Sequence, residues 1–205
     1  MTYTTGYTYY KEGSLNTLTY PSGNVVTYIV GGAGRVTQVS DTAGNTFVAP
    51  PSSTPMYTPN GALANMTQGS GITTNNIYND RLQPILLSAG PASGAVFSLC
   101  YDYHSRVALN VTAQNGQCNF NASITGDNGN VFQVLNNYDS TRGVAFSYDL
   151  LNRITQATTV NTTSGNCWGE AYTIDAWGNL TNIAAAPGMG ANARWKASTP
   201  LPPAP

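Results

Sequence analysis

The sequence contains very little charge. Only 8% of its 205 residues are Asp, Glu, Lys or Arg, and the formal net charge is −1. An average globular domain carries about three times that fraction of charged residues. Without a basic field, the chain is poorly suited to bind a nucleic-acid backbone or an anionic membrane surface. The shortage of charge does not indicate disorder, because hydrophobic residues still make up 41% of the chain.

Long apolar segments are also absent. No run approaches the roughly 18 residues of a transmembrane helix. The first residues, MTYTTGYTYYKEGS, contain neither a basic region nor an apolar stretch, so we expect no signal peptide here. Scarce charge together with abundant Asn, Thr and Tyr is typical of exported bacterial surface proteins. We therefore expect an extracellular or cell-surface location.

Cysteine and histidine are scarce as well. The three cysteines are Cys100, Cys118 and Cys167, and no two of them form a CxxC pair. A zinc ribbon is therefore excluded, and one histidine with scattered carboxylates supplies too few ligands for another metal site. We expect no metal and no cofactor. The cysteines allow either one disulfide with a free thiol or three free thiols, and the sequence does not decide between them.

The residues that are abundant favour β-structure. The chain has 13 tyrosines and 21 glycines, and Asn, Thr and Ser supply most of the remaining polar side chains. Tyr, Thr and Val favour half-buried pleated surfaces, whereas Asn and Gly favour tight turns. Composition alone therefore predicts an all-β chain with many turns.

A short pattern recurs along the whole chain. It consists of an aromatic residue, Asp, two variable residues, Gly or Asn, Arg or Asn, and then Leu, Ile or Val. The clearest copies are YDYHSRV from Tyr101, YDLLNRI from Tyr148 and IDAWGNL from Ile174. Weaker copies start at Tyr9, Val30, Tyr57, Tyr78 and Thr125, and we align the copy at Tyr78 with a two-residue deletion. Successive starts are 21 to 27 residues apart, which is a period typical of a repeat protein.

Each copy predicts a β-hairpin. Alternating runs such as ITQAT after Arg153 indicate a strand with one buried face. At the corner, Asp accepts a bond from the amide two residues on, Gly or Asn takes the left-handed conformation, and Tyr buries its ring. We also expect Arg153 to pair with an aspartate of a neighbouring repeat. The predicted structural corner residues are Tyr101, Asp102, Arg106, Tyr148, Asp149, Arg153, Asp175 and Gly178.

These motifs resemble a known repeat family. YDLLNRITQATT and DAWGNLTNI are similar to the YD repeats, also called RHS repeats, of bacterial Rhs proteins, insecticidal toxin complexes and teneurins. The resemblance implies tandem hairpins that form a continuous twisted sheet, a strip or a partial shell. In toxins of this family the shell encloses a cytotoxic C-terminal domain. The family's self-cleaving, Asp-Pro-containing core motif has no match in this sequence, so the resemblance does not extend to autoproteolysis.

The pattern also divides the chain. We expect a repeat domain of about eight hairpins over residues 1–183, with a Pro/Ser-rich connection at residues 49–56. Residues 184–205 contain no alternation and end in a proline cluster, which predicts a disordered or extended tail. Single hairpins are marginally stable, so the repeats must pair edge to edge. We expect the open edges to pair with further repeats or further copies of the chain.

The only histidine lies in one of the corners. His104 could act as a general base oriented by Asp102, with a nearby hydroxyl or the thiol of Cys100 as nucleophile. The alternative is structural, since Asp102 matches the turn aspartates Asp149 and Asp175. We favour the structural interpretation, because triads usually draw on separate segments.

A second candidate site lies where the repeat pattern is broken. In CWGEAY, Glu170 stands beside Trp168, which could raise the pKa of the carboxyl or stack on a sugar ring. With Trp177, Trp168 could form part of a glycan-binding platform. An exposed charge beside a packed indole is the alternative that we favour.

We therefore predict a structural role, as a scaffold or wall segment of a bacterial exported or surface protein. Two other hypotheses stay open. One is a carbohydrate-binding module that uses Trp168 and Trp177. The other is a small hydrolase that uses Asp102 and His104, or Glu170.

Overall fold

The computed structural model describes residues 3–51, 54–104, 111–114, 117–120, 126–162, 165 and 167–189. The predicted all-β fold is confirmed. Fourteen antiparallel strands form one open sheet in which they follow one another in chain order, and two further strands form a small separate sheet. The only helix in the described residues is the short 3-10 turn η1, Ser140–Arg142.

The strands are short, at four to seven residues each. The main sheet contains β1 Gly6–Tyr9, β2 Leu15–Thr19, β3 Val25–Val30, β4 Val36–Asp41, β5 Thr46–Ala49, β6 Asn65–Gln68, β7 Thr73–Tyr78, β8 Pro84–Gly90, β9 Phe97–Asp102, β12 Gln133–Asn136, β13 Val144–Tyr148, β14 Ile154–Thr159, β15 Gly169–Ile174 and β16 Leu180–Ala185. The small sheet contains β10 Val111–Gln114 and β11 Gln117–Phe120.

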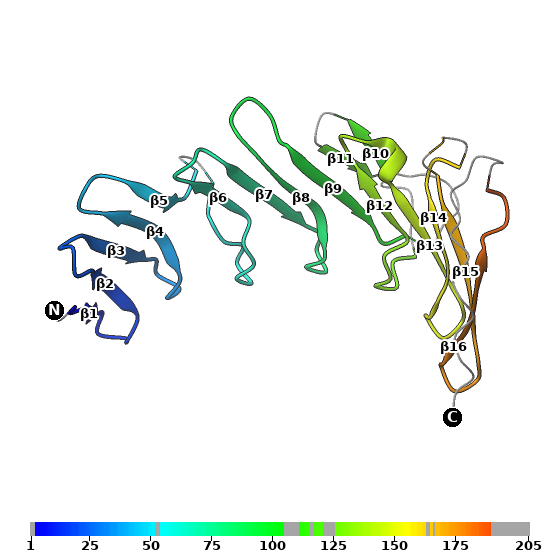
Figure 1. Ribbon diagram of the computed structural model, residues 1–205, viewed down its shortest axis with the longest axis horizontal. Helices are drawn as coiled ribbons and strands as arrows, with labels where there is room; N and C mark the ends of the chain where they lie inside the picture. Colours follow the sequence, from blue (N-terminus) through cyan, green and yellow to red (C-terminus); the bar gives the residue numbers. More distant parts are fainter. Residues whose placement is uncertain are drawn as a thin grey trace. The chain divides into compact units, whose positions relative to one another are not determined.

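The chain forms two compact units. The N-terminal unit contains Met1–Leu82 and Leu87–Val96, and the C-terminal unit contains Gln83–Leu86 and Phe97–Pro205. In the N-terminal unit, strands β1 to β5 follow one another as adjacent antiparallel neighbours (Figure 1). In the C-terminal unit, β13 to β16 are arranged in the same way. Both of these strand runs therefore consist of consecutive hairpins, as the repeat predicts.

The corners between strands share one five-residue geometry. The first residue donates its amide to the carbonyl of the fifth, and the fourth donates its amide back to the carbonyl of the first. The fourth residue has a positive φ in every case, and it is Gly except for Asn152 with φ 60°. A turn followed by a left-handed residue is a common three-residue hairpin connection. The corners of this type are 10–14, 20–24, 31–35, 41–45, 58–62, 68–72, 149–153 and 175–179.

A bulge follows five of these corners. The register shifts by one residue after 10–14, 31–35, 41–45, 149–153 and 175–179. Beyond two of them, the Thr37 hydroxyl donates to the Ile29 carbonyl at 3.2 Å and the Thr181 hydroxyl donates to the Thr173 carbonyl at 3.1 Å. The runs that start VTQ and LTN are therefore not simple alternation, because their threonines stabilise an irregularity in the ladder.

The corner after Tyr78 corrects our alignment of that copy. Asn79 accepts the Arg81 amide at 3.0 Å, as the corner aspartates do, and the Leu82 amide donates to the Asn79 carbonyl. Leu82 has φ 65° and so occupies the position that Gly or Asn occupies elsewhere. No deletion is needed. We mistook Leu82 for the closing aliphatic residue because a leucine is unexpected in the left-handed region.

Replacing Leu82 by glycine should therefore stabilise the protein. The left-handed conformation costs a non-glycine residue about 1–2 kcal/mol, whereas the flexibility of glycine costs about 0.5–1 kcal/mol. We expect Leu82→Gly to raise the free energy of unfolding in urea by up to about 1 kcal/mol. Leu151 is also an exposed corner leucine but has no positive φ, so Leu151→Gly should lower that free energy. An equal decrease in both variants would contradict the strain at Leu82.

The copies at Tyr101 and Thr125 also differ from the prediction. The copy from Tyr101 begins at the end of β9, and the copy from Thr125 ends just before β12. These two strands pair directly with each other, so the two copies belong to one hairpin of the main sheet and do not start two. The intervening hairpin, β10–β11, forms the separate sheet. The motif at Thr125 still forms a turn, in which Asp127 accepts the Gly129 amide at 2.8 Å. The repeat therefore contains an inserted hairpin that the spacing alone did not reveal.

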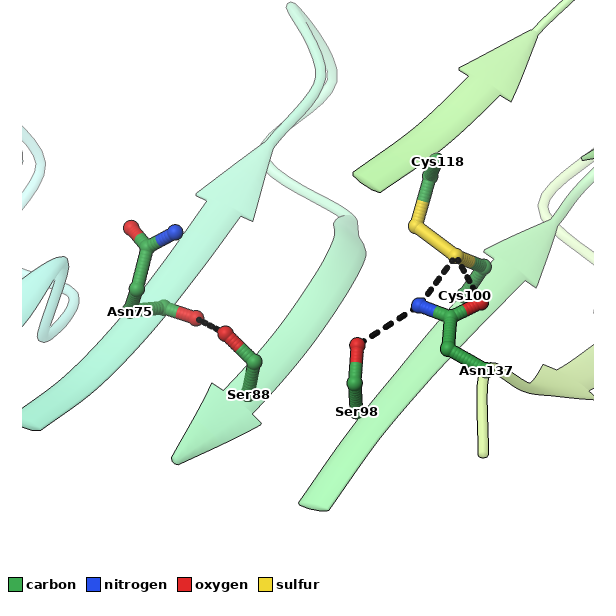
Figure 2. Close-up of a disulfide and its surroundings, with 6 residues drawn as sticks. All are labelled: Asn75, Ser88, Ser98, Cys100, Cys118 and Asn137. Carbon is green, nitrogen blue, oxygen red and sulfur yellow. Dashed lines mark hydrogen bonds between the residues drawn. A yellow bond between two sulfur atoms is a disulfide. The ribbon is translucent and has the colours of Figure 1, made fainter. Parts of the chain in front are cut away.

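A disulfide attaches this insertion to the main sheet. Cys100 in β9 is bonded to Cys118 in β11, and Cys167 is a buried free cysteine. Cys100 packs with Leu86 and Leu135 in the core of the C-terminal unit, with Cys118 and Val160 at its edge. Figure 2 shows the Asn137 side chain beside the disulfide, with Nδ2 donating to Ser98 Oγ at 2.6 Å and lying 3.4 Å from Cys100 Sγ. Of the two alternatives left open above, the structure has the disulfide with one free thiol.

Candidate functional site

Aspartates close three corners in the same way. Asp149 Oδ1 accepts the amides of Leu151 and Arg153, both at 2.9 Å. Asp175 Oδ1 accepts the amides of Trp177 at 2.9 Å and Asn179 at 2.8 Å. Both carboxylates therefore accept backbone amides within their own corner. Asp41, which the motif did not include, has the same contacts with Ala43 and Asn45 at the corner 41–45.

These bonds favour the ionised carboxylates. Hydrogen bonds from the Asn45 side chain lower the pKa of Asp41, the Arg153 amide lowers that of Asp149, and the Asn179 side chain lowers that of Asp175, each from an ordinary value of 3.8. Carboxylates with lowered pKa values are weak general acids at neutral pH. The corner aspartates are therefore suited to holding turns closed and not to proton transfer.

The lowered pKa values predict acid sensitivity. A carboxyl whose pKa is lower in the folded state stabilises the fold fully above its unfolded pKa, near 3.8, and loses that contribution as the pH falls toward the folded pKa. We expect the melting temperature to decrease below about pH 4. In Asp149→Asn, the melting temperature should be lower at neutral pH and should change less between pH 5 and pH 3. An unchanged pH dependence in this variant would contradict the role of Asp149.

Tyrosine hydroxyls connect successive corners. Tyr57 donates to the Val36 carbonyl at 2.8 Å and Tyr78 donates to the Leu63 carbonyl at 3.0 Å. In the C-terminal unit, Tyr103 donates to Pro84 at 3.0 Å and Tyr148 donates to Val131 at 2.7 Å. Val36 and Leu63 directly follow the corners 31–35 and 58–62, so each tyrosine reaches the carbonyl just after the previous corner. We call these bonds the tyrosine clamps.

Tyr148 illustrates how a clamp is buried. Its ring packs edge to face on Phe132, with the ring centroids 5.1 Å apart. Burial raises the pKa of the Tyr148 phenol, so the hydroxyl remains a donor at neutral pH. A buried hydrogen-bond donor that loses its acceptor destabilises the fold more than an exposed donor does, because water replaces the acceptor only at the exposed site. Tyr148 therefore packs its ring and also donates a hydrogen bond, which the sequence did not reveal.

Arg153 also joins two corners. Its Nε donates to Asp149 Oδ2 at 2.6 Å within its own corner, and its Nη1 donates to the Asp175 carbonyl of the next corner at 2.9 Å. We expected an ion pair with a neighbouring aspartate. The ion pair is instead formed with Asp149, and the neighbouring repeat contributes a backbone carbonyl. Arg106, the corresponding predicted corner residue, lies outside the described residues.

The structure brings Asp102 and His104 together. His104 Nδ1 lies 2.6 Å from Asp102 Oδ1, and the same oxygen accepts the His104 amide at 3.0 Å. The Asp102 side chain is 5% exposed and the His104 side chain is 27% exposed. This is the geometry of an oriented imidazole. The proposed thiol nucleophile is wrong, because Cys100 forms the disulfide. Tyr101, another predicted corner residue, lies in β9 directly before Asp102, the last residue of that strand.

Glu170 accepts a hydrogen bond from a tyrosine. The Tyr172 hydroxyl donates to Glu170 Oε2 at 2.9 Å, and burial with this bond raises the pKa of Tyr172 to about 12. Trp168 lies just before β15, where its backbone carbonyl and amide bond with the buried Thr159 hydroxyl. Trp177 is 87% exposed and lies in the corner after the other end of β15, beside Gly178. The structure therefore does not bring the two tryptophans together.

The described residues contain no group of three or more His, Cys, Asp or Glu side chains placed to hold a metal ion. Within the same part of the chain, no helix is long and apolar enough to cross a membrane.

Comparison with solved structures identifies the fold. A chain of the Photorhabdus luminescens Tc holotoxin pore with a TccC3 mutation matches with a TM-score of 0.58 and 20% identity, over 88% of this chain and 9% of that chain. A TcdB2–TccC3 structure without its hypervariable C-terminal region matches with a TM-score of 0.62 and 19% identity, over 91% of this chain and 9% of that chain. No family model and no curated protein matches the sequence.

The similarity confirms the RHS-like fold that the motifs predicted. At 20% sequence identity, the similarity supports a shared fold and does not extend to function. The chain spans about 9% of the length of these toxin-complex chains.

Proposed function

We propose that this chain is a structural segment of a β-sheet wall, part of a scaffold or shell in an exported, toxin-related bacterial protein. The observation that carries the proposal is the tyrosine clamps. The polar groups of the motif are the tyrosine hydroxyls and the corner aspartates. Both bond with backbone atoms of the same or the preceding corner. A site that served catalysis would instead leave such groups convergent and available.

Two further observations support this proposal. The fold neighbours are toxin-complex chains of which this chain matches only a small share, as a wall segment would. The Cys100–Cys118 disulfide is typical of proteins that fold in an oxidising compartment. We assign the wall to the predicted repeat domain, residues 1–183, together with Ala184 and Ala185, which complete β16. Most of the predicted tail, residues 190–205, lies outside the described residues.

The wall would continue at its outer strands. Within the described residues, β1 and β16 each have one neighbour in the sheet. Thr8 pairs with Thr17, and Tyr10 donates its amide to Ser14, so the backbone groups of Tyr7 and Tyr9 point to the open side of β1. Unpaired edges of this kind add further strands. We propose that they pair with other repeats or with further copies of the chain.

Proline substitution at the edge tests this pairing. By light scattering over a roughly hundredfold concentration range, the wild-type chain should show reversible self-association. Tyr7→Pro removes an outward amide and should reduce association without lowering the melting temperature. The matched variant Thr8→Pro removes an inward amide and should loosen β1 from β2, which hydrogen exchange would detect. A wild-type chain that stays monomeric throughout would contradict edge pairing.

The Asp102–His104 pair supports a second candidate, a small hydrolase. A buried carboxylate that orients an imidazole is an arrangement used by general bases. A panel of ester, phosphoester and glycoside substrates, repeated on His104→Ala and Glu170→Gln, tests it. Turnover that disappears in one variant would favour the hydrolase, and turnover at the buffer rate would exclude it for those substrates. Glycan-array binding lost in Trp168→Ala or Trp177→Ala would instead favour a carbohydrate-binding module.

A further inference from the structure

The N-terminal unit contains a groove beside an unusual corner. It lies between the corner 31–35 and the proline-rich connection that leads to Tyr57, and its volume is about 660 Å³. Its walls are largely apolar, with Pro51, Pro55, Met56 and the Tyr57 ring among them, and Arg35 is its only charged residue. Small-molecule sites commonly occupy about 300–1,000 Å³ and combine apolar walls with a few polar groups.

Comparison of two corners shows why Arg35 differs. Arg35 and Arg153 are both the fifth residue of a corner. At 149–153 the first residue is Asp149, whose carboxylate pairs with Arg153 at 2.6 Å. At 31–35 the first residue is Gly31, which has no carboxylate. All nine acidic residues lie in the described part of the chain, and none of them forms an ion pair with Arg35 there.

The position of the Arg35 guanidinium is nevertheless well defined. Its Cζ lies 5.6 Å from the Tyr57 ring centroid, and the Tyr57 hydroxyl is held by the Val36 carbonyl at 2.8 Å. On another side it lies against Gly61, where an added Cβ would come within 2.3 Å of Nη2. A half-buried guanidinium held by two corners has lost much of the side-chain entropy that anion binding would otherwise cost.

We propose that this groove binds an organic carboxylate with an apolar body. Arg35 takes the carboxylate, in place of the aspartate that the other corner supplies to Arg153. The apolar part of the ligand contacts Met56, the Tyr57 ring and the prolines. Charge complementarity selects this ligand class, because the single charge in the groove is a planar cation that matches carboxylate geometry.

Titration with a matched pair of ligands tests the proposal. Phenylacetate has an apolar ring and a carboxylate, and phenylacetamide is its neutral counterpart. By calorimetry on the full chain, we expect phenylacetate to bind at least about tenfold more tightly than phenylacetamide. Arg35→Gln should remove this preference, whereas Arg142→Gln, which changes an exposed arginine of the C-terminal unit, should retain it. Arg35→Lys should show an intermediate preference, because it keeps the charge without the planar fork.

Two further measurements complete the test. The first uses the wild-type chain, so a folding defect in a variant cannot affect it. In the wild-type chain, saturating phenylacetate should shift the amide resonance of Gly61, which lies against the guanidinium. Peptides that end in phenylalanine, with a free or amidated C-terminus, distinguish a peptide source of the carboxylate from a small molecule. Tighter binding of the free-acid peptide than of phenylacetate indicates a peptide, and the reverse order indicates a small molecule. Equal binding of acid and amide, an unchanged preference in Arg35→Gln, or no saturable binding up to about 20 mM would overturn the proposal.

Discussion

Loss of the Cys100–Cys118 disulfide should destabilise the C-terminal unit by about 3 kcal/mol, the amount expected when a bridge closes a loop of this size. The two cysteines are 18 residues apart in the sequence. We expect the double variant Cys100→Ala/Cys118→Ala to lower the free energy of unfolding in urea by this amount. Hydrogen exchange should increase most in the β10–β11 hairpin, which the bridge attaches to β9.

Reduction of the wild-type chain supplies the control. A reducing agent should lower the stability of the wild type but leave the double variant unchanged. In Cys167→Ala the response to reduction should persist, because the Cys167 thiol is not part of the bridge. Unchanged stability of the wild type on reduction would contradict a structural role for the disulfide.

Truncation of Leu86 should have a comparable or larger effect. Leu86 is 2% exposed and packs with Cys100 and Leu135 in the core of the C-terminal unit. Removal of a buried leucine side chain typically costs about 2–5 kcal/mol, because the lost transfer free energy is added to the cost of a cavity. We expect Leu86→Ala to lower the urea midpoint accordingly, as measured by circular dichroism.

Leu151 provides the matched control for this substitution. It is 70% exposed in the corner 149–153, so Leu151→Ala should change stability by less than about 0.5 kcal/mol. Equal effects of the two leucine substitutions would show that the Leu86 cluster is not the core of this unit.

Most of the local structure could be predicted from the sequence, because local chemistry determines it. Asp149 and Asp175 act on amides two and four residues ahead, and Gly178 adopts a conformation that few other residues tolerate. These interactions lie within one motif, so a single copy contains the information. Repetition of the motif then led to the all-β fold and to the RHS-like resemblance.

The features that were missed depend on contacts between distant residues or on exceptions to local preference. The Tyr148 hydroxyl bonds with the carbonyl of Val131, 17 residues earlier, which closes the preceding copy of the motif, and one copy alone does not reveal a contact between copies. The partner of Cys100 depends on how the inserted hairpin returns to β9. Leu82 occupies a left-handed position against its own preference, which shifted our alignment of that copy.

The central claim is that the motif residues hold successive hairpins together, and Tyr148→Phe tests it most directly. This change removes the Tyr148 clamp while retaining the ring. Tyr138, which is 54% exposed, supplies the control variant Tyr138→Phe. In urea unfolding, we expect Tyr148→Phe to lose about 1 kcal/mol and Tyr138→Phe to match the wild type. Equal stability of the two variants would contradict the account.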